Sequence, residues 1–368
     1  MEASAGTCRL LYVVGQLGLG GLERQLSYLL RVIDKARYRP AVIVWNSSPN
    51  DMYADEIRAL GIPIHCFPRT ATSVAKLHGV RRLARRCVPE VIHSYSFFTN
   101  FAVQWAAFGT DAVAVGSLRG DFIKDKKDSG LWKGCLSARW PRYQISNSVS
   151  SADIARRSGG VFIPQRIDIV RNGLDLERFR SRNGRGGSQT YIAAVGSLLP
   201  VKRWDRLLNI VEQVKRKKVD CRVRIAGDGP LRRCLEQLAQ NLGISDCVEF
   251  IGATLDVPAF LEESRFVVHT SDSEGCPNAV MEAMACARAV VAMAAGDIPF
   301  LVEDGQSGFV VRQGDETTFA TRVVQLLSDG DLCHRMGMAA RARVEREFGL
   351  GRLVSETLGA YKSAGWTG

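Results

Sequence analysis

Residues 269–311 read HTSDSEGCPNAVMEAMACARAVVAMAAGDIPFLVEDGQSGFVV, and this stretch indicates the fold class. The apolar run that leads into it, FVVH, predicts a buried strand, which a polar loop from Thr270 to Asn278 follows. A helix is expected from Pro277, because proline suits the first turn of a helix. The apolar runs AVVAMAAG and GFVV predict two further strands. Strands that alternate with helices are typical of an α/β fold with a parallel sheet.

The same alternation runs through the whole chain, which at 368 residues is too long for one ordinary core. The glycine-rich, basic segment 180–189 is the best candidate for a linker. We predict two doubly wound, Rossmann-like domains, residues 1–179 and residues 190–349. A final helix over 350–368 belongs to either domain as far as the sequence shows, and packing back on the first is one option. Ligands of open α/β sheets bind beyond the carboxyl ends of the strands, so a central cleft is expected.

The loop and helix after the FVVH strand carry the chemistry. The free N–H groups of Asn278, Ala279 and Val280, with the positive end of the helix, form an anion site. Glu274 precedes this helix, and Glu282 lies just over one turn inside it. Two acids beside a phosphate site are explained if they accept hydrogen bonds from sugar hydroxyls. The alternatives are a helix-dipole role for Glu274 and a solvated position for Glu282.

A second glycine-rich turn lies near the amino terminus, in LLYVVGQLGLGGLERQLSYLLRVI (residues 10–33). A dinucleotide fingerprint that uses Gly18 and Gly20 requires glycine where Glu23 stands. The next strand, PAVIVWNSS, also has Asn46 near its end and no acid to bind a ribose. The loop is therefore expected to approach a phosphate without binding NAD, which disfavours a dehydrogenase.

The net charge of +11 and the pI of about 9.3 favour an anionic partner. Two basic stretches, residues 74–87 and 121–140, mix lysine and arginine with apolar residues such as Phe122, Leu131 and Trp132. They are either solvated faces or a surface that lies on anionic lipid headgroups. No nucleic-acid-binding module is recognisable, so no nucleic acid is expected as a partner.

The amino terminus lacks the basic-then-apolar pattern of a signal peptide, and no apolar run approaches the roughly 20 residues of a membrane span. The expected location is therefore cytoplasmic, with peripheral attachment to the inner face of the membrane as an option.

Several segments together resemble the retaining glycosyltransferases of family 4, which have the GT-B fold. They are GGLERQL and IDIVRNGLDLERF in the first half, and AAVGSLLPVKRWDRLL, IAGDGPLR, VEFIGAT, SDSEGCPNAVMEAMA and GDIPFLVEDGQSGFVV in the second. The resemblance spans nearly the whole chain and includes two glutamates with seven residues between them, in EGCPNAVME. It implies two Rossmann-like domains that face a cleft.

The resemblance also implies roles for individual residues. Glu274 would bind the transferred sugar's hydroxyls, Glu282 the nucleotide ribose, and Lys202 the diphosphate as negative charge develops on it. The other donor contacts that it implies are Gly20, Gly21, Gly227, Ile251, Gly275, Cys276, Pro277, Asn278 and Ala279. Neither a metal nor another cofactor is expected, because Lys202 and the helix amides supply the positive field.

The chain departs from the family pattern at two places. Many relatives carry arginine where this chain has Ser197, and Arg203 is the residue that could replace it in binding the donor. Many also carry a histidine near the reacting carbon, where this chain has Arg119 and Asp121. Arg119 cannot act as a base at neutral pH, so it would hold a phosphate or an anionic acceptor, or pair with Asp121. His93, at a strand's carboxyl end, is the third acceptor-side candidate.

We therefore predict a glycosyltransferase that moves a sugar from a UDP- or GDP-linked donor to a hydroxyl acceptor with retention. Glu274, Lys202 and Arg119 are the predicted catalytic residues. A glycan or lipid-linked acceptor would suit cell-surface polysaccharide or glycolipid synthesis. The alternatives are a nucleotide-sugar epimerase or hydrolase, and a non-catalytic nucleotide-sugar-binding protein of the same fold.

Overall fold

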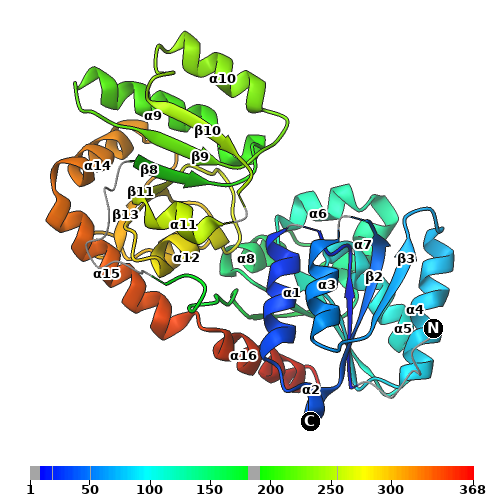
Figure 1. The fold of residues 1–368 in the computed structure, drawn as a ribbon. Coiled ribbons are helices and arrows are strands. Elements are labelled where there is room, and N and C mark those ends of the chain that lie inside the picture. Colours follow the sequence, from blue (N-terminus) through cyan, green and yellow to red (C-terminus); the bar gives the residue numbers. More distant parts are fainter. Residues whose placement is uncertain (1–8, 19, 50, 181–190, 255) are drawn as a thin grey trace. The chain divides into compact units, whose positions relative to one another are not determined.

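The computed structural model describes residues 9–18, 20–49, 51–180, 191–254 and 256–368. The chain forms two compact units (Figure 1). The first unit contains residues 1–173 and 350–368, and the second contains residues 174–349.

Within the described residues, the first unit is built on a seven-stranded sheet in the order β3-β2-β1-β4-β5-β6-β7. All its strand pairs are parallel. The order reverses between β1 and β4, which creates a switch point at the carboxyl ends of these strands. The strands are β1 Leu10–Val14, β2 Pro40–Ser47, β3 Ile64–Pro68, β4 Val91–Ser94, β5 Val113–Leu118, β6 Tyr143–Ser146 and β7 Arg166–Ile169.

Helices cover both faces of this sheet (Figure 1). One buried apolar cluster joins Leu26 of α1, Ile57 of α3 and Tyr361 of α16 to one face, and another joins Val80 of α4 and Val103 of α5 to the other. The helices are α1 Gly21–Val32, α2 Lys35–Tyr38, α3 Met52–Ala59, α4 Ser73–Cys87, α5 Asn100–Ala107, α6 Phe122–Asp128, α7 Leu131–Arg139, α8 Val149–Arg157 and α16 Leu350–Ser363, with the 3-10 helix η1 Phe97–Thr99.

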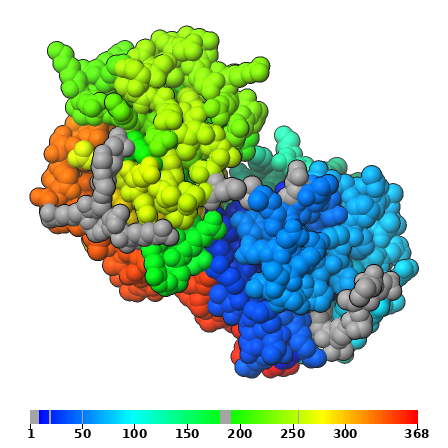
Figure 2. All heavy atoms as spheres, in the orientation of Figure 1, coloured from blue at the N-terminus to red at the C-terminus, as the bar shows by residue number. Residues whose placement is uncertain are grey.

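The C-terminal helix α16 is part of the first unit, although the rest of this unit ends at Gly173. Its Leu353, Ala360 and Tyr361 are buried in the cluster that α1 also enters. In Figure 2 the red atoms of the C-terminal segment accordingly lie against blue atoms of the amino-terminal segment.

The second unit has, in the part that the structure describes, a six-stranded parallel sheet in the order β10-β9-β8-β11-β12-β13. The order reverses between β8 and β11. The strands are β8 Tyr191–Val195, β9 Val223–Ala226, β10 Val248–Gly252, β11 Ser264–His269, β12 Val290–Met293 and β13 Gly308–Val311. The central strands are buried on both faces, which is why they read as continuous apolar runs.

Two apolar clusters again lie on opposite faces of the sheet. The first packs under α9, α10 and α14, and the second under α11, α12, α13 and α15. The helices are η2 Pro200–Lys202, α9 Trp204–Arg216, α10 Arg232–Asn241, α11 Val257–Glu262, α12 Asn278–Ala285, α13 Ile298–Leu301, α14 Glu316–Ser328 and α15 Gly330–Glu347. The predicted α/β fold with two doubly wound units is confirmed.

The amino-terminal segment of the first unit ends at Gly173, whereas the boundary predicted from the sequence is residue 179. The physical reason is that the segment after Gly173 pairs with the second unit. The backbone N–H of Leu174 donates a 2.8 Å hydrogen bond to the carbonyl of Phe348, and Phe179 is buried in that unit's core. The predicted linker 180–189 lies outside the described residues, apart from Arg180.

Candidate active site

The switch point of the second sheet gathers the candidate donor-site residues. Strand β8 leads into the turn that contains Lys202, and the neighbouring strand β11 leads into the loop that contains Glu274. These loops therefore leave the same edge of the sheet at the point where the strand order reverses.

The side chains of Lys202 and His269 both contact the carboxylate of Glu274. Lys202 Nζ donates a 2.6 Å hydrogen bond to Glu274 Oε1, and His269 Nε2 lies 2.9 Å from the same oxygen. Burial alone would raise the pKa of Glu274, but the bond from His269 and the charge of Lys202 outweigh it, so the pKa lies well below its usual range. The site therefore contains an ionised carboxylate with a lysine beside it.

The backbone after Glu274 depends on a glycine that is not part of the predicted site. Gly296 has φ +55°, and a Cβ atom there would lie 1.9 Å from the Glu274 carbonyl oxygen. The next residue, Asp297, donates a 3.1 Å backbone hydrogen bond to the carbonyl of Gly275. A glycine between a strand and a helix, in AAGDIP, was the available signal. Gly296 thus allows the Glu274 loop to approach the following turn closely.

Helix α12 begins directly after this loop. Pro277 is its extended N-cap, makes no side-chain cap bond, and leaves Asn278 as the first helical residue. Cys276 is buried, with its Sγ 3.5 Å from Met281 Sδ. Glu282 is only 2% exposed, so the alternative of a solvated position for it is wrong. The predicted anion site and both acids thus lie around the amino end of one helix.

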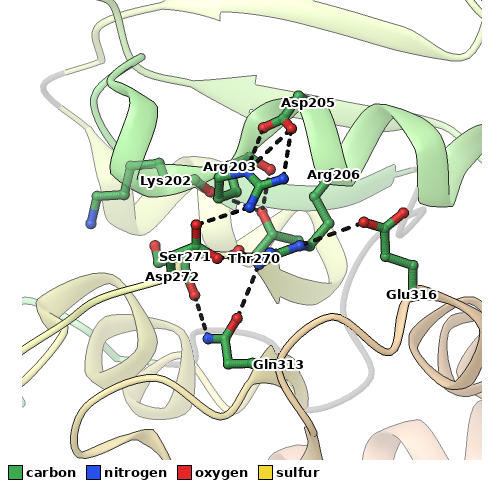
Figure 3. Close-up of polar contacts among 9 residues, drawn as sticks. All are labelled: Lys202, Arg203, Asp205, Arg206, Thr270, Ser271, Asp272, Gln313 and Glu316. Carbon is green, nitrogen blue, oxygen red and sulfur yellow. Dashed lines mark hydrogen bonds and ion pairs between the residues drawn. The ribbon is translucent and has the colours of Figure 1, made fainter.

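Arg203 does not replace the missing arginine as a free phosphate ligand. It has φ +51°, and its guanidinium donates to Asp205 and, at 2.9 Å, to Asp272 (Figure 3). In Figure 3 the side chain of Lys202 extends away from this cluster. The prediction that Arg203 binds the donor is not supported, because two carboxylates already occupy its donors.

A second arginine connects α9 to the loop after β11. Arg206 is 5% exposed and donates to the Thr270 carbonyl at 2.8 Å and to Asp272 at 2.7 Å (Figure 3). Gln313 accepts from Arg206 and donates to the Ser271 carbonyl. These buried bonds fix the start of the Glu274 loop. They could not be predicted from the sequence, because they join segments that are distant in the chain.

The strand ends predicted to border the base also meet at this edge. Gly227 follows β9 and donates a 2.8 Å backbone hydrogen bond to Gly252, the last residue of β10, which follows Ile251. A Cβ atom at Gly227 would lie 1.9 Å from the Gly196 carbonyl oxygen. Glycine is therefore required at Gly227 by packing, and its contact with a base stays a prediction.

The first unit has its own pocket, of about 900 Å³, at the carboxyl edge of its sheet. It lies at the switch point, because Gly15 after β1 and Ser96 after β4 both line it. Arg119, which follows β5, also lines it, whereas His93 and Asp121 do not. Among the described residues, no three His, Cys, Asp or Glu side chains are grouped so that they could hold a metal ion.

Two family models match the two halves of the chain. Residues 19–178 match the family model "Glycosyltransferase Family 4", and residues 175–343 match "Glycosyl transferases group 1". The chain belongs to glycosyltransferase family 4.

Among relatives, the N-acetyl-alpha-D-glucosaminyl L-malate synthase of Bacillus anthracis is 29% identical over 195 residues, 53% of this chain and 50% of that protein. The putative colanic acid biosynthesis glycosyltransferase WcaL of Salmonella typhimurium is 31% identical over 195 residues, 50% of this chain and 48% of that protein. The chain thus spans about half the length of the curated relatives that it matches.

Solved structures show the same fold at low identity. HepE of Anabaena, in complex with UDP-glucose, has a TM-score of 0.81 at 20% identity and covers 96% of this chain and 99% of its own. Sucrose-phosphate synthase of Thermosynechococcus elongatus has a TM-score of 0.80 at 16% identity, with 96% and 98% covered. The fold of this family 4 chain is accordingly GT-B.

His93 is not an open acceptor ligand in this family member. It is 1% exposed, its Nδ1 lies 2.7 Å from Tyr361 Oη of α16, and its Nε2 lies 3.1 Å from Ser117 Oγ. Burial lowers the pKa of His93 well below 6.5, and the charge of Arg119 acts in the same direction. The prediction of an acceptor contact is wrong, because partners within the core occupy both ring nitrogens.

Asp121 is likewise occupied. Its carboxylate caps α6 by accepting from the backbone N–H groups of Ile123 and Lys124, at 3.0 and 3.1 Å. The structure has no salt bridge between Asp121 and Arg119 among the described residues, and an acceptor contact of Asp121 stays a prediction.

The basic helices of the first unit differ in part from the prediction. Lys76 is 3% exposed and donates to Asn46, and Phe122 is fully buried, so neither is on the surface. Leu131 and Trp132 are exposed. No helix in the described part of the chain has the length and apolar character needed to cross a membrane.

The glycine loop of the first unit places Gly20 as the extended N-cap of α1 and Gly21 as its first residue. A Cβ atom at Gly20 would lie 2.1 Å from Glu23 Oε2, so a larger residue there would displace the end of the Glu23 side chain. Burial raises the pKa of Glu23. Contact of Gly20 and Gly21 with phosphate stays a prediction.

Proposed function

We propose that the chain transfers a sugar from a nucleoside diphosphate donor, UDP- or GDP-linked, to an acceptor hydroxyl with retention at the anomeric carbon. The single observation that carries this proposal is the contact of Lys202 and His269 with Glu274 beside the amino end of α12. It supplies a cation and amides for a diphosphate, together with a carboxylate for sugar hydroxyls.

In the proposed reaction, Lys202 exchanges Glu274 for a diphosphate oxygen. Glu274, which His269 still contacts, then accepts hydrogen bonds from the transferred sugar. The buried carboxylate of Glu282 binds the ribose. The bond between the anomeric carbon and the diphosphate breaks as the acceptor oxygen bonds to that carbon from the same face. The acceptor proton passes to the departing diphosphate, whose charge Lys202 and the α12 amides stabilise.

We further propose that the acceptor is a glycan or a lipid-linked intermediate of polysaccharide or glycolipid synthesis. Exposed Ile123, Leu131 and Trp132 lie among lysines of α6 and α7, a combination that suits an anionic membrane surface. Sedimentation with anionic liposomes at low salt tests this point, and it should weaken in the Trp132→Ser variant. Equal sedimentation with neutral liposomes contradicts it.

Donor binding is tested by thermal shift with UDP-, GDP- and ADP-linked sugars. Either the UDP-linked or the GDP-linked sugars should raise the Tm of the wild type. The same sugars should raise the Tm of the Glu282→Ala variant much less. Glu345→Ala, which removes an exposed carboxylate on α15, is the control that should keep the full rise in Tm. No rise with any nucleotide sugar, or an equal rise in Glu282→Ala, contradicts the proposed function.

A further inference from the structure

The pocket of the first unit has aromatic walls. Trp45, Phe97, Phe98 and Phe101 line it, and its volume of about 900 Å³ lies within the usual range for small-ligand sites. Aromatic rings offer flat apolar surface against which the C–H face of a sugar ring can pack. The pocket is therefore large enough and suitably lined for a sugar-sized ligand.

Arg119 brings a positive charge to this pocket without a carboxylate partner in the described residues. Its guanidinium carbon lies 4.0 Å above the ring centroid of Tyr95, which is fully buried. Arg119 Nε is buried and has no hydrogen-bond partner among the described residues. Buried polar atoms without partners are rare, and because Arg119 lines the pocket, a ligand bound there can complete the hydrogen bonds of its guanidinium.

Neighbouring groups leave this charge available. Asp121, the nearest acid in sequence, is used as the cap of α6. Burial and the charges of Asp121 and Asp128 raise the pKa of Asp125 to about 6. Lys76, also at the pocket, donates to Asn46. Among the described residues Arg119 thus forms no close ion pair, although the acids Glu23, Asp125 and Asp128 also line the pocket.

We propose that this pocket binds an acceptor that carries an anionic group, a carboxylate or a phosphate, on a sugar or another polyol. Arg119 holds the anionic group, and the ring packs against the aromatic walls. Asp125, whose pKa of about 6 leaves it largely ionised at neutral pH, accepts hydrogen bonds from hydroxyls. This inference rests on the proposed function, because it defines the acceptor of that reaction.

The test measures the affinity of the full chain for matched neutral and charged ligands by NMR titration. The probes are glucose, glucuronate, glucose 6-phosphate and inorganic phosphate. A charge-assisted bond to arginine should make at least one charged sugar bind about tenfold tighter than glucose. Arg119→Gln should remove this preference, and Arg119→Lys should keep part of it. Lys124→Gln, an exposed charge on α6, is the control that should leave it unchanged.

Several results would overturn the proposal. They are equal binding of glucose and both charged sugars, no binding of either charged sugar, and an unchanged preference in Arg119→Gln. Inorganic phosphate that binds as tightly as glucose 6-phosphate would show a free-phosphate site and not an acceptor site. The same samples are titrated with UDP and GDP. If neither UDP nor GDP binds the wild type, the proposed function is contradicted. If a nucleotide binds but the sugar probes show no preference for charge, only this inference is contradicted.

Discussion

Lys202 Nζ lies 2.6 Å from Glu274 Oε1, although 72 residues separate the two in the chain. Their side chains are 20% and 12% exposed, so the pair is largely screened from water. The cation expected to bind the diphosphate and the acid expected to bind the sugar therefore neutralise each other in this structure. Donor binding must exchange one interaction of Lys202 for another, which couples the two halves of the donor site.

The pH dependence of stability should reveal this pair. The pKa of Glu274 lies below its ordinary 4.5, because the contacts with His269 and Lys202 outweigh burial. Its ionised form therefore stabilises the fold above about pH 4.5, and this contribution is lost as the pH falls through the lower folded-state pKa. Urea unfolding between about pH 5 and pH 3 should show a steeper loss of stability in the wild type than in Glu274→Gln.

The exposed carboxylate of Glu345 on α15 provides a control for that measurement, because surface ion pairs contribute little. The Glu345→Gln curve should run parallel to the wild type. Parallel curves for the wild type and Glu274→Gln would contradict the role given to the pair.

His269 should matter for the sugar more than for the nucleotide. It contacts Glu274 at 2.9 Å and does not belong to the predicted diphosphate site. Loss of one hydrogen bond to a charged group costs about 1.5 kcal/mol, or roughly tenfold in affinity. We expect His269→Ala to weaken the nucleotide sugar about tenfold relative to the free nucleotide, and His269→Gln to recover part of this. Calorimetric titration measures both, and an equal loss for both ligands argues for a purely structural histidine.

Two glycines with similar backbone angles offer a matched test of the Glu274 loop. Gly296 and Gly243 have φ +55° and +65°, but only Gly296 has backbone atoms where a Cβ would stand. Alanine in this conformation costs about 1 kcal/mol by itself. Gly243→Ala should lose about that much stability, whereas Gly296→Ala should lose about 3 kcal/mol or more and weaken donor binding. Equal losses in chemical denaturation would show that the close contact is not tight.

The buried bond between His93 and Tyr361 should stabilise the first unit. Tyr361→Phe leaves His93 Nδ1 buried without its 2.7 Å partner, at a cost of about 1–3 kcal/mol. Burial and the charge of Arg119 hold the pKa of His93 below 6.5. The unfolded chain therefore takes up a proton before the folded chain does, and the free energy of unfolding falls as the pH drops below about 6.5. The thermal midpoint of Tyr361→Phe should fall while Tyr38→Phe changes little. An unchanged midpoint would contradict this role.

The fold could be predicted from the sequence because the strands of both sheets are apolar runs separated by helical segments. The boundary at Gly173 could not, because it depends on the backbone pairing of Leu174 with Phe348. Leu174 and Phe348 are far apart in the chain, and no local sequence pattern shows which remote segment pairs with a given backbone segment.

The candidate site shows the same division. Glu274, Glu282 and Lys202 follow from motifs, because a loop before a helix amino end is a local feature. The positive φ of Arg203 depends on three-dimensional context, and so does the partner that α16 brings to His93. Neither feature follows from a local sequence pattern.

The most direct test of the central claim compares nucleoside diphosphate with monophosphate by calorimetry. UDP or GDP should bind the wild type at least about tenfold tighter than UMP or GMP, because Lys202 and the α12 amides hold the second phosphate. Lys202→Met should remove most of this difference. Lys215→Met, which breaks an exposed 2.6 Å pair with Asp246, should preserve it. A difference that stays the same in Lys202→Met, or that is absent in the wild type, would contradict the account.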